Sequence, residues 1–172
     1  MKRKYTLFLF CFIVSFIFYS CKKEQGCTSP TAMNYYADAE EDDGSCIFAY
    51  DLAQGVWVIT PDCEELSIPV IGTISFNDQI PETVEILPGG GSTLFIDIDN
   101  TQVSGDINPS GYVIVNEQTI SIDPGLGFPL DVIVTGTGQV SSENTGYMNL
   151  TYSFDIPLVG NQSIDCSITM IK

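Results

Sequence analysis

The chain has 172 residues, of which 22 are acidic, six are Lys or Arg and none is His, and its formal net charge is −16. The absence of histidine excludes Ser-His-Asp and Cys-His catalysis and histidine-ligated zinc or copper. The shortage of cationic side chains argues against binding to nucleic acids, phosphate ligands and anionic lipid surfaces.

The first twenty residues have the pattern of an export signal. Basic residues occupy positions 2–4, and fifteen uncharged, mostly apolar residues follow from Tyr5 to Tyr19. Spanning the hydrocarbon core of a bilayer takes about 20 apolar residues. This run is shorter, so it favours a signal peptide over a permanent transmembrane helix.

The segment Phe18-Tyr19-Ser20-Cys21 resembles a lipobox, in which a small residue precedes a cysteine that is acylated and becomes the new N-terminus. Phe18 and Tyr19 depart from the usual Leu and Ala, Ser or Thr, and bulky variants are expected in Bacteroidota lipoproteins. The resemblance implies a signal peptide at 1–20, a palmitate-type lipid on Cys21 and a place in the outer membrane. The alternative is an ordinary secretory signal peptide with an incidental cysteine.

Cleavage after residue 20 would leave 22 acidic residues against three lysines, Lys22, Lys23 and Lys172, which is a net charge of −19. Such an acid excess keeps an exposed domain soluble, and this explains it without a binding role. Lys22-Lys23-Glu24 is similar to signals that send Bacteroidota lipoproteins to the cell surface. It does not separate cell-surface display from a periplasmic position.

Four cysteines remain for the folded part of the exported chain: Cys27, Cys46, Cys63 and Cys166. They allow three pairings, and an oxidising envelope compartment lets disulfides form. We predict a Cys27–Cys46 disulfide, because these two residues bracket one small module, and therefore a Cys63–Cys166 disulfide. A zinc site of four thiolates is the alternative, although the chain has no C-x-x-C spacing.

After a tether at 21–26, residues 27–48 form an acidic module. The segment from Gly26 resembles a repeat of secreted Bacteroidota proteins, G-C-T-D-P-x-A-x-N-Y-x-x-x-A-x-x-D-D-G-S-C, with Ser29 in place of the usual Asp. A segment this short has too few apolar side chains for its own core. A disulfide worth about 3 kcal/mol would supply most of its order.

Asp38, Asp42 and Asp43 lie in this module with no basic neighbour. Carboxylates held close together attract calcium. Calcium is therefore the candidate cofactor, and a calcium-dependent interaction or adhesion module is one candidate function. The spacing differs from that of an EF-hand loop, and a solvated acidic turn at Asp43-Gly44 fits the sequence equally well.

From residue 49 to residue 172 the pattern predicts an all-β domain. Apolar and polar residues alternate strictly over 148–156 and again over 164–170, as in strands with one buried face. Turn clusters, including Asp99-Asn100, Asn116-Glu117 and Pro124-Gly125, separate the predicted strands, and one helical turn is predicted at 50–54. Such strands predict an antiparallel up-and-down meander, closed as a barrel or flattened as a two-sheet sandwich. The predicted strands are 55–60, 68–76, 83–87, 93–99, 101–107, 112–115, 118–122, 130–140, 148–156 and 164–170.

Gly55-Val56-Trp57 at the start of the first strand resembles the G-x-W motif of lipocalin-like proteins. The resemblance implies a barrel in which Trp57 closes one end, and Cys63 and Cys166 match the cysteines that small lipoproteins of this kind carry. A closed interior would hold a small apolar ligand, with Trp57 and Tyr152 as candidate binding residues. The alternative is that side chains simply fill the interior.

Paired carboxylates are the one catalytic device that this composition leaves open. The candidate acids Asp97, Asp99, Asp155 and Asp165 lie on predicted strands, and alternation directs them towards solvent, where nothing raises a carboxyl pKa. A hydrolase is therefore a remote alternative. We expect a non-enzymatic envelope lipoprotein that contacts the membrane through its anchor and binds a small apolar ligand or an envelope protein.

Overall fold

The structure is a computed structural model that describes residues 23–68, 72–77, 80–98, 101–122 and 129–172. The predicted signal peptide and Cys21 lie outside these ranges, as do the predicted turns at 99–100 and 124–125. No helix within the described ranges combines the length and the hydrophobicity needed to cross a bilayer. The described residues divide into two compact units, one with residues 23–30 and 35–46 and the other with residues 31–34 and the described part of 47–172.

The smaller unit is the acidic module, and two short backbone pairings and one disulfide order it. Strands β1 (Gln25–Gly26) and β2 (Glu41–Asp42) pair in parallel. The amides of Glu40 and Glu41 donate to the carbonyl oxygen of Glu24, at 2.8 and 3.2 Å. The predicted disulfide between Cys27 and Cys46 is confirmed, and it joins the two ends of the intervening loop.

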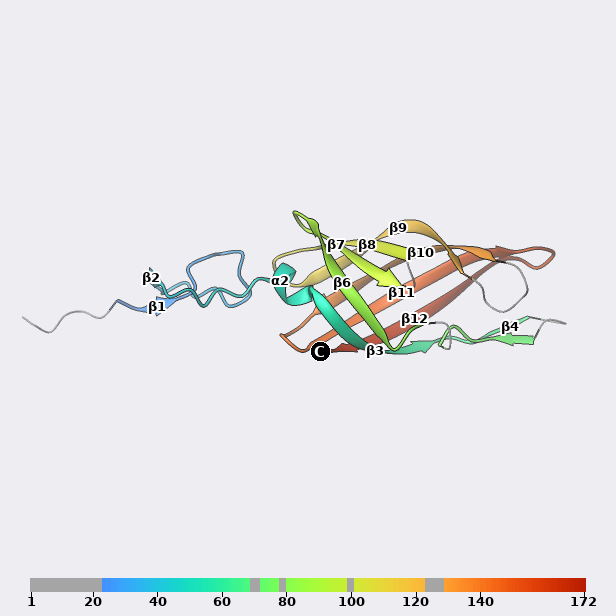
Figure 1. The fold of residues 1–172 in the computed structure, drawn as a ribbon, viewed down its shortest axis with the longest axis horizontal. Coiled ribbons are helices and arrows are strands. Elements are labelled where there is room, and N and C mark those ends of the chain that lie inside the picture. Colours follow the sequence, from blue (N-terminus) through green and yellow to red (C-terminus); the bar gives the residue numbers. More distant parts are fainter. Residues whose placement is uncertain (1–22, 69–71, 78–79, 99–100, 123–128) are drawn as a thin grey trace, which may run out of the picture. The chain divides into compact units, whose positions relative to one another are not determined.

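The larger unit is an eight-stranded antiparallel barrel (Figure 1). Each strand pairs with its neighbour along the chain, and the last strand pairs with the first. The predicted all-β meander is confirmed, and it closes as an up-and-down barrel. The strands are β3 (Gly55–Cys63), β6 (Thr83–Gly90), β7 (Thr93–Ile98), β8 (Thr101–Ile107), β9 (Tyr112–Ile122), β10 (Leu130–Val140), β11 (Thr145–Ile156) and β12 (Gly160–Ile171).

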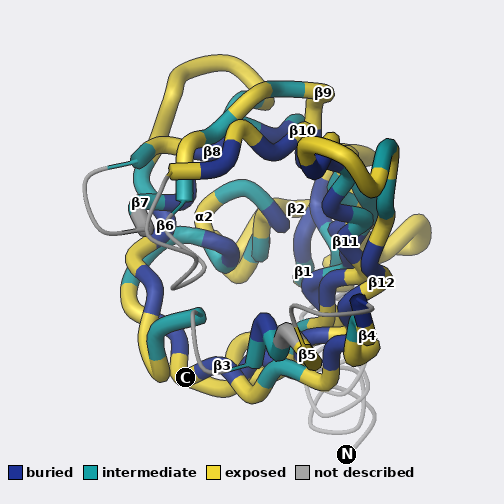
Figure 2. The backbone as a smooth tube through the Cα atoms, turned by 90° about the vertical axis from the view of Figure 1, so that its right-hand side faces the viewer, coloured by how far each residue is buried: buried dark blue, intermediate teal, exposed yellow. Residues whose placement is uncertain are grey.

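Alternation of side chains decides which face of each strand lines the barrel. On β11, every second residue from Met148 to Ile156 is buried, while Asn149 and Asp155 are exposed. On β12 the same alternation buries Ile164, Cys166, Ile168 and Met170. Figure 2 looks along the barrel and shows the strands as a ring in which buried and exposed positions alternate.

The barrel closes where β12 runs antiparallel to β3. Their register places Cys166 opposite Cys63 and Ile171 opposite Val58. The two cysteines form the predicted disulfide, which is confirmed and links residues 103 positions apart. Both cysteine side chains are buried with the apolar core.

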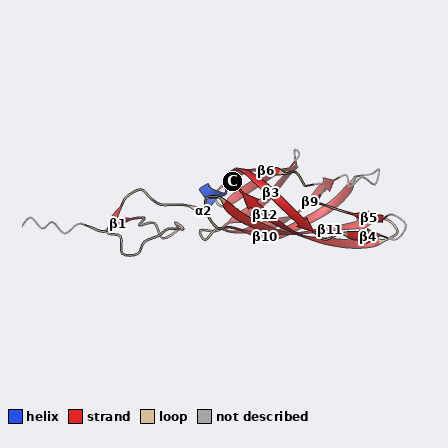
Figure 3. Cartoon of the chain, turned by 90° about the horizontal axis from the view of Figure 1, so that it is seen from below, coloured by secondary structure: helices blue, strands red, loops and turns tan. Residues whose placement is uncertain are grey.

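Among the described residues of the barrel unit, the one short helix is α2 (Ala49–Ala53), which confirms the helical turn predicted at 50–54. It lies at one end of the barrel (Figures 1 and 3). Ala49 and Ala53 are buried on the side that faces the core, whereas Asp51 is exposed. A run of only five residues depends on this packing, because an isolated helix of that length is not stable in water.

The single strand predicted at 68–76 is wrong. The chain forms a hairpin of two short strands, β4 (Leu66–Ile68) and β5 (Gly72–Ile74), with Ile68 opposite Gly72. Gly72 has a φ of 110°, a conformation that residues other than glycine rarely adopt. The apolar run therefore contains a chain reversal that the hydrophobic pattern does not reveal.

The two strands predicted at 112–115 and 118–122 are one strand, β9, so the turn predicted at Asn116-Glu117 is wrong. On β10, Val134 pairs with Gln118 and Gly136 pairs with Val115. Asn116 and Glu117 together therefore stand opposite a single residue, which makes a β-bulge. Gly136 is required there, because a Cβ atom at this position would collide with the carbonyl oxygen of Asn149 on β11.

We predict that replacing Cys63 and Cys166 together by Ala lowers the free energy of unfolding of the barrel by about 3–5 kcal/mol. The disulfide closes a long loop and so restricts the unfolded chain. The measurement is urea unfolding followed by Trp57 fluorescence. The Cys27→Ala/Cys46→Ala variant is the control and should leave the barrel transition in place. Equal losses in the two variants would contradict this assignment.

Candidate functional site

The interior of the barrel is apolar throughout the described part of the chain. Every fully buried side chain there is hydrophobic, and no charged or amide side chain is buried. Chemistry that needs a desolvated acid, base or ion pair therefore has no groups to use inside. What the interior offers is apolar surface and the space that the side chains leave between them.

One space lies near α2, and we call it the helix-end cavity. Its walls include Ala53, Leu94, Val113 and Val140, and it leaves about 20 Å³ for the centre of a water-sized sphere. Tyr147 also borders this cavity although its side chain is 46% exposed. Most of its other lining residues are buried, so the cavity lies inside the barrel at its helix end.

A second space lies farther along the barrel, and we call it the tyrosine cavity. Its walls include Ile59, Ile80, Val103, Val134 and Tyr152, and it leaves about 30 Å³ for the centre of a water-sized sphere. One such sphere needs about 10–15 Å³. Each cavity therefore has room for one or two small groups, and side chains fill most of the interior.

Three side chains, Ile96, Met148 and Met170, border both cavities. They come from β7, β11 and β12, so they separate one cavity from the other inside the barrel. Two of the three are methionines, which are unbranched and adapt their shape at little cost. The partition between the cavities is therefore the most adjustable part of the interior.

Trp57 closes the helix end of the barrel. Its side chain is fully buried, and Nε1 donates a hydrogen bond of 2.7 Å to the carbonyl oxygen of Ala53. The amine of Lys172 lies 4.8 Å from the centroid of the Trp57 ring and donates to the carbonyl oxygens of Leu52 (2.5 Å) and Gln54 (2.6 Å). Partial burial lowers the pKa of Lys172. Trp57 lines neither cavity and holds α2 in place.

Tyr152 is the second ligand-binding candidate, and it does line a cavity. Its side chain is only 6% exposed, and this burial raises the pKa of the phenol to about 12. The ring lies 5.7 Å, centroid to centroid, from the ring of Phe76, which also packs on Phe154 at 5.7 Å. The phenol therefore stays protonated and neutral at physiological pH.

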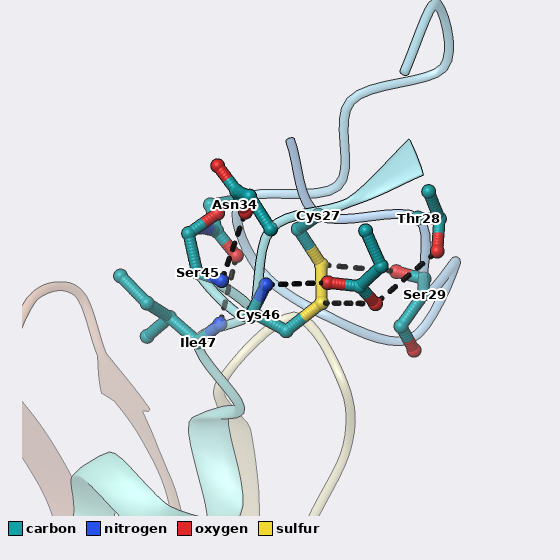
Figure 4. The surroundings of a disulfide bond; sticks show 10 residues. Cys27, Thr28, Ser29, Asn34, Ser45, Cys46 and Ile47 are labelled. Carbon is teal, nitrogen blue, oxygen red and sulfur yellow. Dashed lines mark hydrogen bonds between the residues drawn. A yellow bond between two sulfur atoms is a disulfide. The ribbon is translucent and has the colours of Figure 1, made fainter. Parts of the chain in front are cut away.

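The candidate calcium residues are exposed and act in local turns. Asp42 accepts hydrogen bonds from Thr28 Oγ1 (3.2 Å) and from the amide of Gly44 (2.7 Å). Figure 4 shows Thr28 and Ser29 near the Cys27–Cys46 disulfide. Asp43 accepts from the amide of Ser45 at 2.9 Å, and hydrogen bonds with Ser45 lower the pKa of its carboxyl.

Asp38 is exposed as well, and no three acidic or cysteine side chains of the described residues form a group that could hold a metal ion. The residue types fit calcium, but the turn geometry uses Asp42 and Asp43 as acceptors for their own loop. A calcium site in the module stays a sequence prediction.

Of the candidate strand acids, Asp165 borders an open surface pocket of about 640 Å³ together with Asp62 and Glu64, whereas Asp97 and Asp155 do not border it. Asp155 and Asp165 are exposed on β11 and β12, where Asp165 accepts a hydrogen bond of 2.7 Å from Thr151. Asp97 on β7 is half-buried. Asp99 lies outside the described residues.

Comparison of the chain with protein-family models, with curated proteins and with solved structures finds no match. The barrel and the disulfides are therefore known from the geometry alone. The lipobox, the repeat around Cys27 and the G-x-W motif remain sequence resemblances.

Sequence reasoning did not single out Met148, Met170, Ile96 or Lys172. Alternation placed Met148 and Met170 among the buried residues of their strands, but their meeting across the barrel depends on register and closure. The position of Lys172 can be predicted once β12 is known to pair with β3. Ile171 lies opposite Val58, so the next residue of β12 lies beside Trp57.

We predict that Lys172→Met lowers the free energy of unfolding by about 1 kcal/mol. The substitution removes two hydrogen bonds to the last carbonyls of α2 and the contact of the ammonium with the Trp57 ring, all near the surface. Urea unfolding followed by the single tryptophan measures the change. Lys172→Arg, which keeps the charge, should lose less, and equal midpoints for Lys172→Met and the unchanged chain would contradict the contact.

Proposed function

We propose that this chain is a non-enzymatic, lipid-anchored lipoprotein of the bacterial outer membrane whose barrel binds a small apolar ligand. The observation that carries the ligand assignment is the apolar interior in which Met148 and Met170 separate two cavities. The observation that carries the anchor is the lipobox-like sequence that ends at Cys21. The two assignments are tested separately.

The disulfides support export from the cytosol. Both pairs lie within the folded units, and disulfides persist in oxidising compartments and rarely in a reducing cytosol. The scarcity of cationic side chains supports attachment by a lipid. A chain with no Lys, Arg or His between Glu24 and Ile171 has no basic surface with which to bind anionic lipid head groups.

The methionine partition supports ligand uptake by a barrel that is nearly full. Drug-sized ligands occupy pockets of about 300–1,000 Å³, so neither cavity accepts one as it stands. If Met148 and Met170 change rotamer, the two spaces join without movement of the strands. The ligand is therefore small and apolar, and it takes the place of methionine side-chain contacts.

For the anchor, we predict that the product made in a bacterial cell lacks residues 1–20 and carries acyl chains on Cys21. Intact-mass analysis and membrane fractionation measure both properties. Cys21→Ser should abolish acylation and membrane association, whereas Cys11→Ser should change neither, because Cys11 is lost with the signal peptide. A product that keeps residues 1–20 would contradict the assignment.

For the ligand, we predict that benzene added to the full chain shifts the methyl NMR signals of Met148 and Met170. The chain has only four methionines, which can be labelled selectively. Met33 borders neither cavity and is the internal control. Equal shifts at Met33, or none at Met148 and Met170, would contradict binding inside the barrel.

A substitution at the partition strengthens this experiment. Met148→Ala should tighten benzene binding by joining the cavities, at a cost of about 2–5 kcal/mol in the free energy of unfolding. Ile164→Ala is the matched control, since Ile164 is also a buried core residue and borders neither cavity. If both variants gain benzene affinity alike, the partition has no special role.

A further inference from the structure

We propose that an apolar patch on the outer face of the barrel docks a protein partner whose contact surface is apolar at its centre and carries Lys or Arg at its margin. The patch lies across the seam at which β12 pairs with β3 (Figure 1), so we call it the seam patch. Its members are Val56 and Val58 of β3, Ile171 of β12 and Tyr147 of β11. The proposal goes beyond ligand binding inside the barrel and does not depend on it.

The four side chains of the seam patch are exposed although all are large and apolar. Val56, Val58 and Ile171 are 59%, 54% and 57% exposed, and Tyr147 is 46% exposed. They occupy outward positions of strands whose alternate residues fill the core. Folding of the barrel therefore leaves their apolar surface in contact with water.

The members of the seam patch are neighbours on one surface. Ile171 and Val58 stand directly opposite each other across the seam, and Val56 is the adjacent outward residue of β3. Tyr147 stands opposite Thr169, so it is diagonal to Ile171 and within the reach of an aromatic side chain. Single exposed apolar residues are common on protein surfaces, whereas a contiguous group of them marks an interaction site.

Ile133 on β10 shows the contrast. It is 42% exposed, but its cross-strand neighbours are Ser153 on β11 and Thr119 on β9, which are both polar. Ile133 is therefore a single exposed apolar residue with no apolar residue opposite it, and it serves as the matched control for the seam patch.

Carboxylates border the seam patch on the side of β6. Glu85 is exposed and stands directly opposite Val56. Glu82 is also exposed, and its carbonyl oxygen accepts a hydrogen bond of 2.9 Å from the amide of Ile59, the residue after Val58. A surface that is apolar at its centre and anionic at its margin is complementary to one that is apolar at its centre and cationic at its margin.

The charge of the chain selects among the possible occupants. It has no Lys, Arg or His between Glu24 and Ile171, and its formal net charge is −16. A second copy of the chain would bring the same carboxylates against the patch, and like charges placed together disfavour such a complex. An anionic lipid surface repels the chain for the same reason. A protein partner with basic residues around an apolar centre matches both parts of the surface.

The test uses the full chain and a synthetic amphipathic peptide of leucine and lysine. Two companion peptides separate the contributions: serine replaces leucine in one, and glutamate replaces lysine in the other. Calorimetric titration at physiological ionic strength measures the affinities. The unchanged chain should bind the leucine–lysine peptide more tightly than the serine–lysine peptide, and it should not bind the leucine–glutamate peptide.

Variants then locate the binding surface. Val58→Thr/Ile171→Thr should lower the affinity for the leucine–lysine peptide about tenfold, because it removes apolar surface while threonine keeps the strand propensity. Ile133→Thr should leave the affinity unchanged. Glu85→Gln should lower it about threefold through the loss of one exposed charge pair. Asp155→Asn, which removes an exposed acid at the far end of β11, should have no effect.

The opposite results overturn the proposal. It is wrong if Ile133→Thr loses as much affinity as Val58→Thr/Ile171→Thr, or if the serine–lysine peptide binds as tightly as the leucine–lysine peptide. If the unchanged chain sediments as a dimer that the double substitution dissociates, the occupant is a second copy. If the double substitution releases the Cys21→Ser chain from phosphatidylcholine vesicles, the occupant is lipid. Either occupant would overturn the assignment to a cationic protein partner.

Discussion

The pairing of β12 with β3 is the interaction on which the rest of the barrel depends. Without it, the eight strands would form an open sheet with two unpaired edges, and edges of that kind invite association with other chains. The pairing brings together residues far apart in the sequence: Cys166 meets Cys63, and Ile171 meets Val58. The disulfide fixes the register at the end of the pairing where Cys166 meets Cys63. At the other end, the same register brings Lys172 into contact with Trp57 and α2. Both ends of the seam are therefore fastened by groups that only closure brings together.

Closure of the barrel also determines that the acidic residues of the strands lie on its outer face. A closed barrel has a desolvated interior in which an unpaired charge is costly, and this chain has almost no cations with which to pair its 22 acidic residues. The acidic residues of the strands therefore occupy the outward positions between buried apolar residues, as Asp155 and Asp165 do on β11 and β12.

The hydrogen bonds of Asp106 show how a strand carboxylate is stabilised at the surface. Thr93, Asn116 and Ser92 donate to this carboxylate and lower its pKa, so its contribution to stability is present at neutral pH and is lost as the pH falls through that lowered value.

Alternation of apolar and polar residues in the sequence correctly predicted the buried faces of β11 and β12 and the all-β meander. The sequence also predicted the turn of helix at α2 and both disulfides. It missed the hairpin of β4 and β5, because the continuous apolar run carries no hydrophobic signal for two paired strands. It divided β9 in two, because Asn116-Glu117 has the composition of a turn and is accommodated as a bulge through its pairing with β10. The site was only partly predictable: Tyr152 was a candidate, but the partition by Met148 and Met170 depends on how three strands meet across a closed barrel.

The same closure explains why side chains rather than strands must adjust to a ligand. When a cavity forms in an open or loosely packed core, the surrounding elements can move together and remove part of the empty volume. Here every barrel strand is hydrogen-bonded on both sides and the seam carries a disulfide, so the wall has little freedom to contract. The spaces on either side of Met148 and Met170 therefore persist in the empty protein, and the flexible thioether side chains are the parts that can change. A rigid wall and an adjustable partition together support the proposed binding of a small apolar ligand.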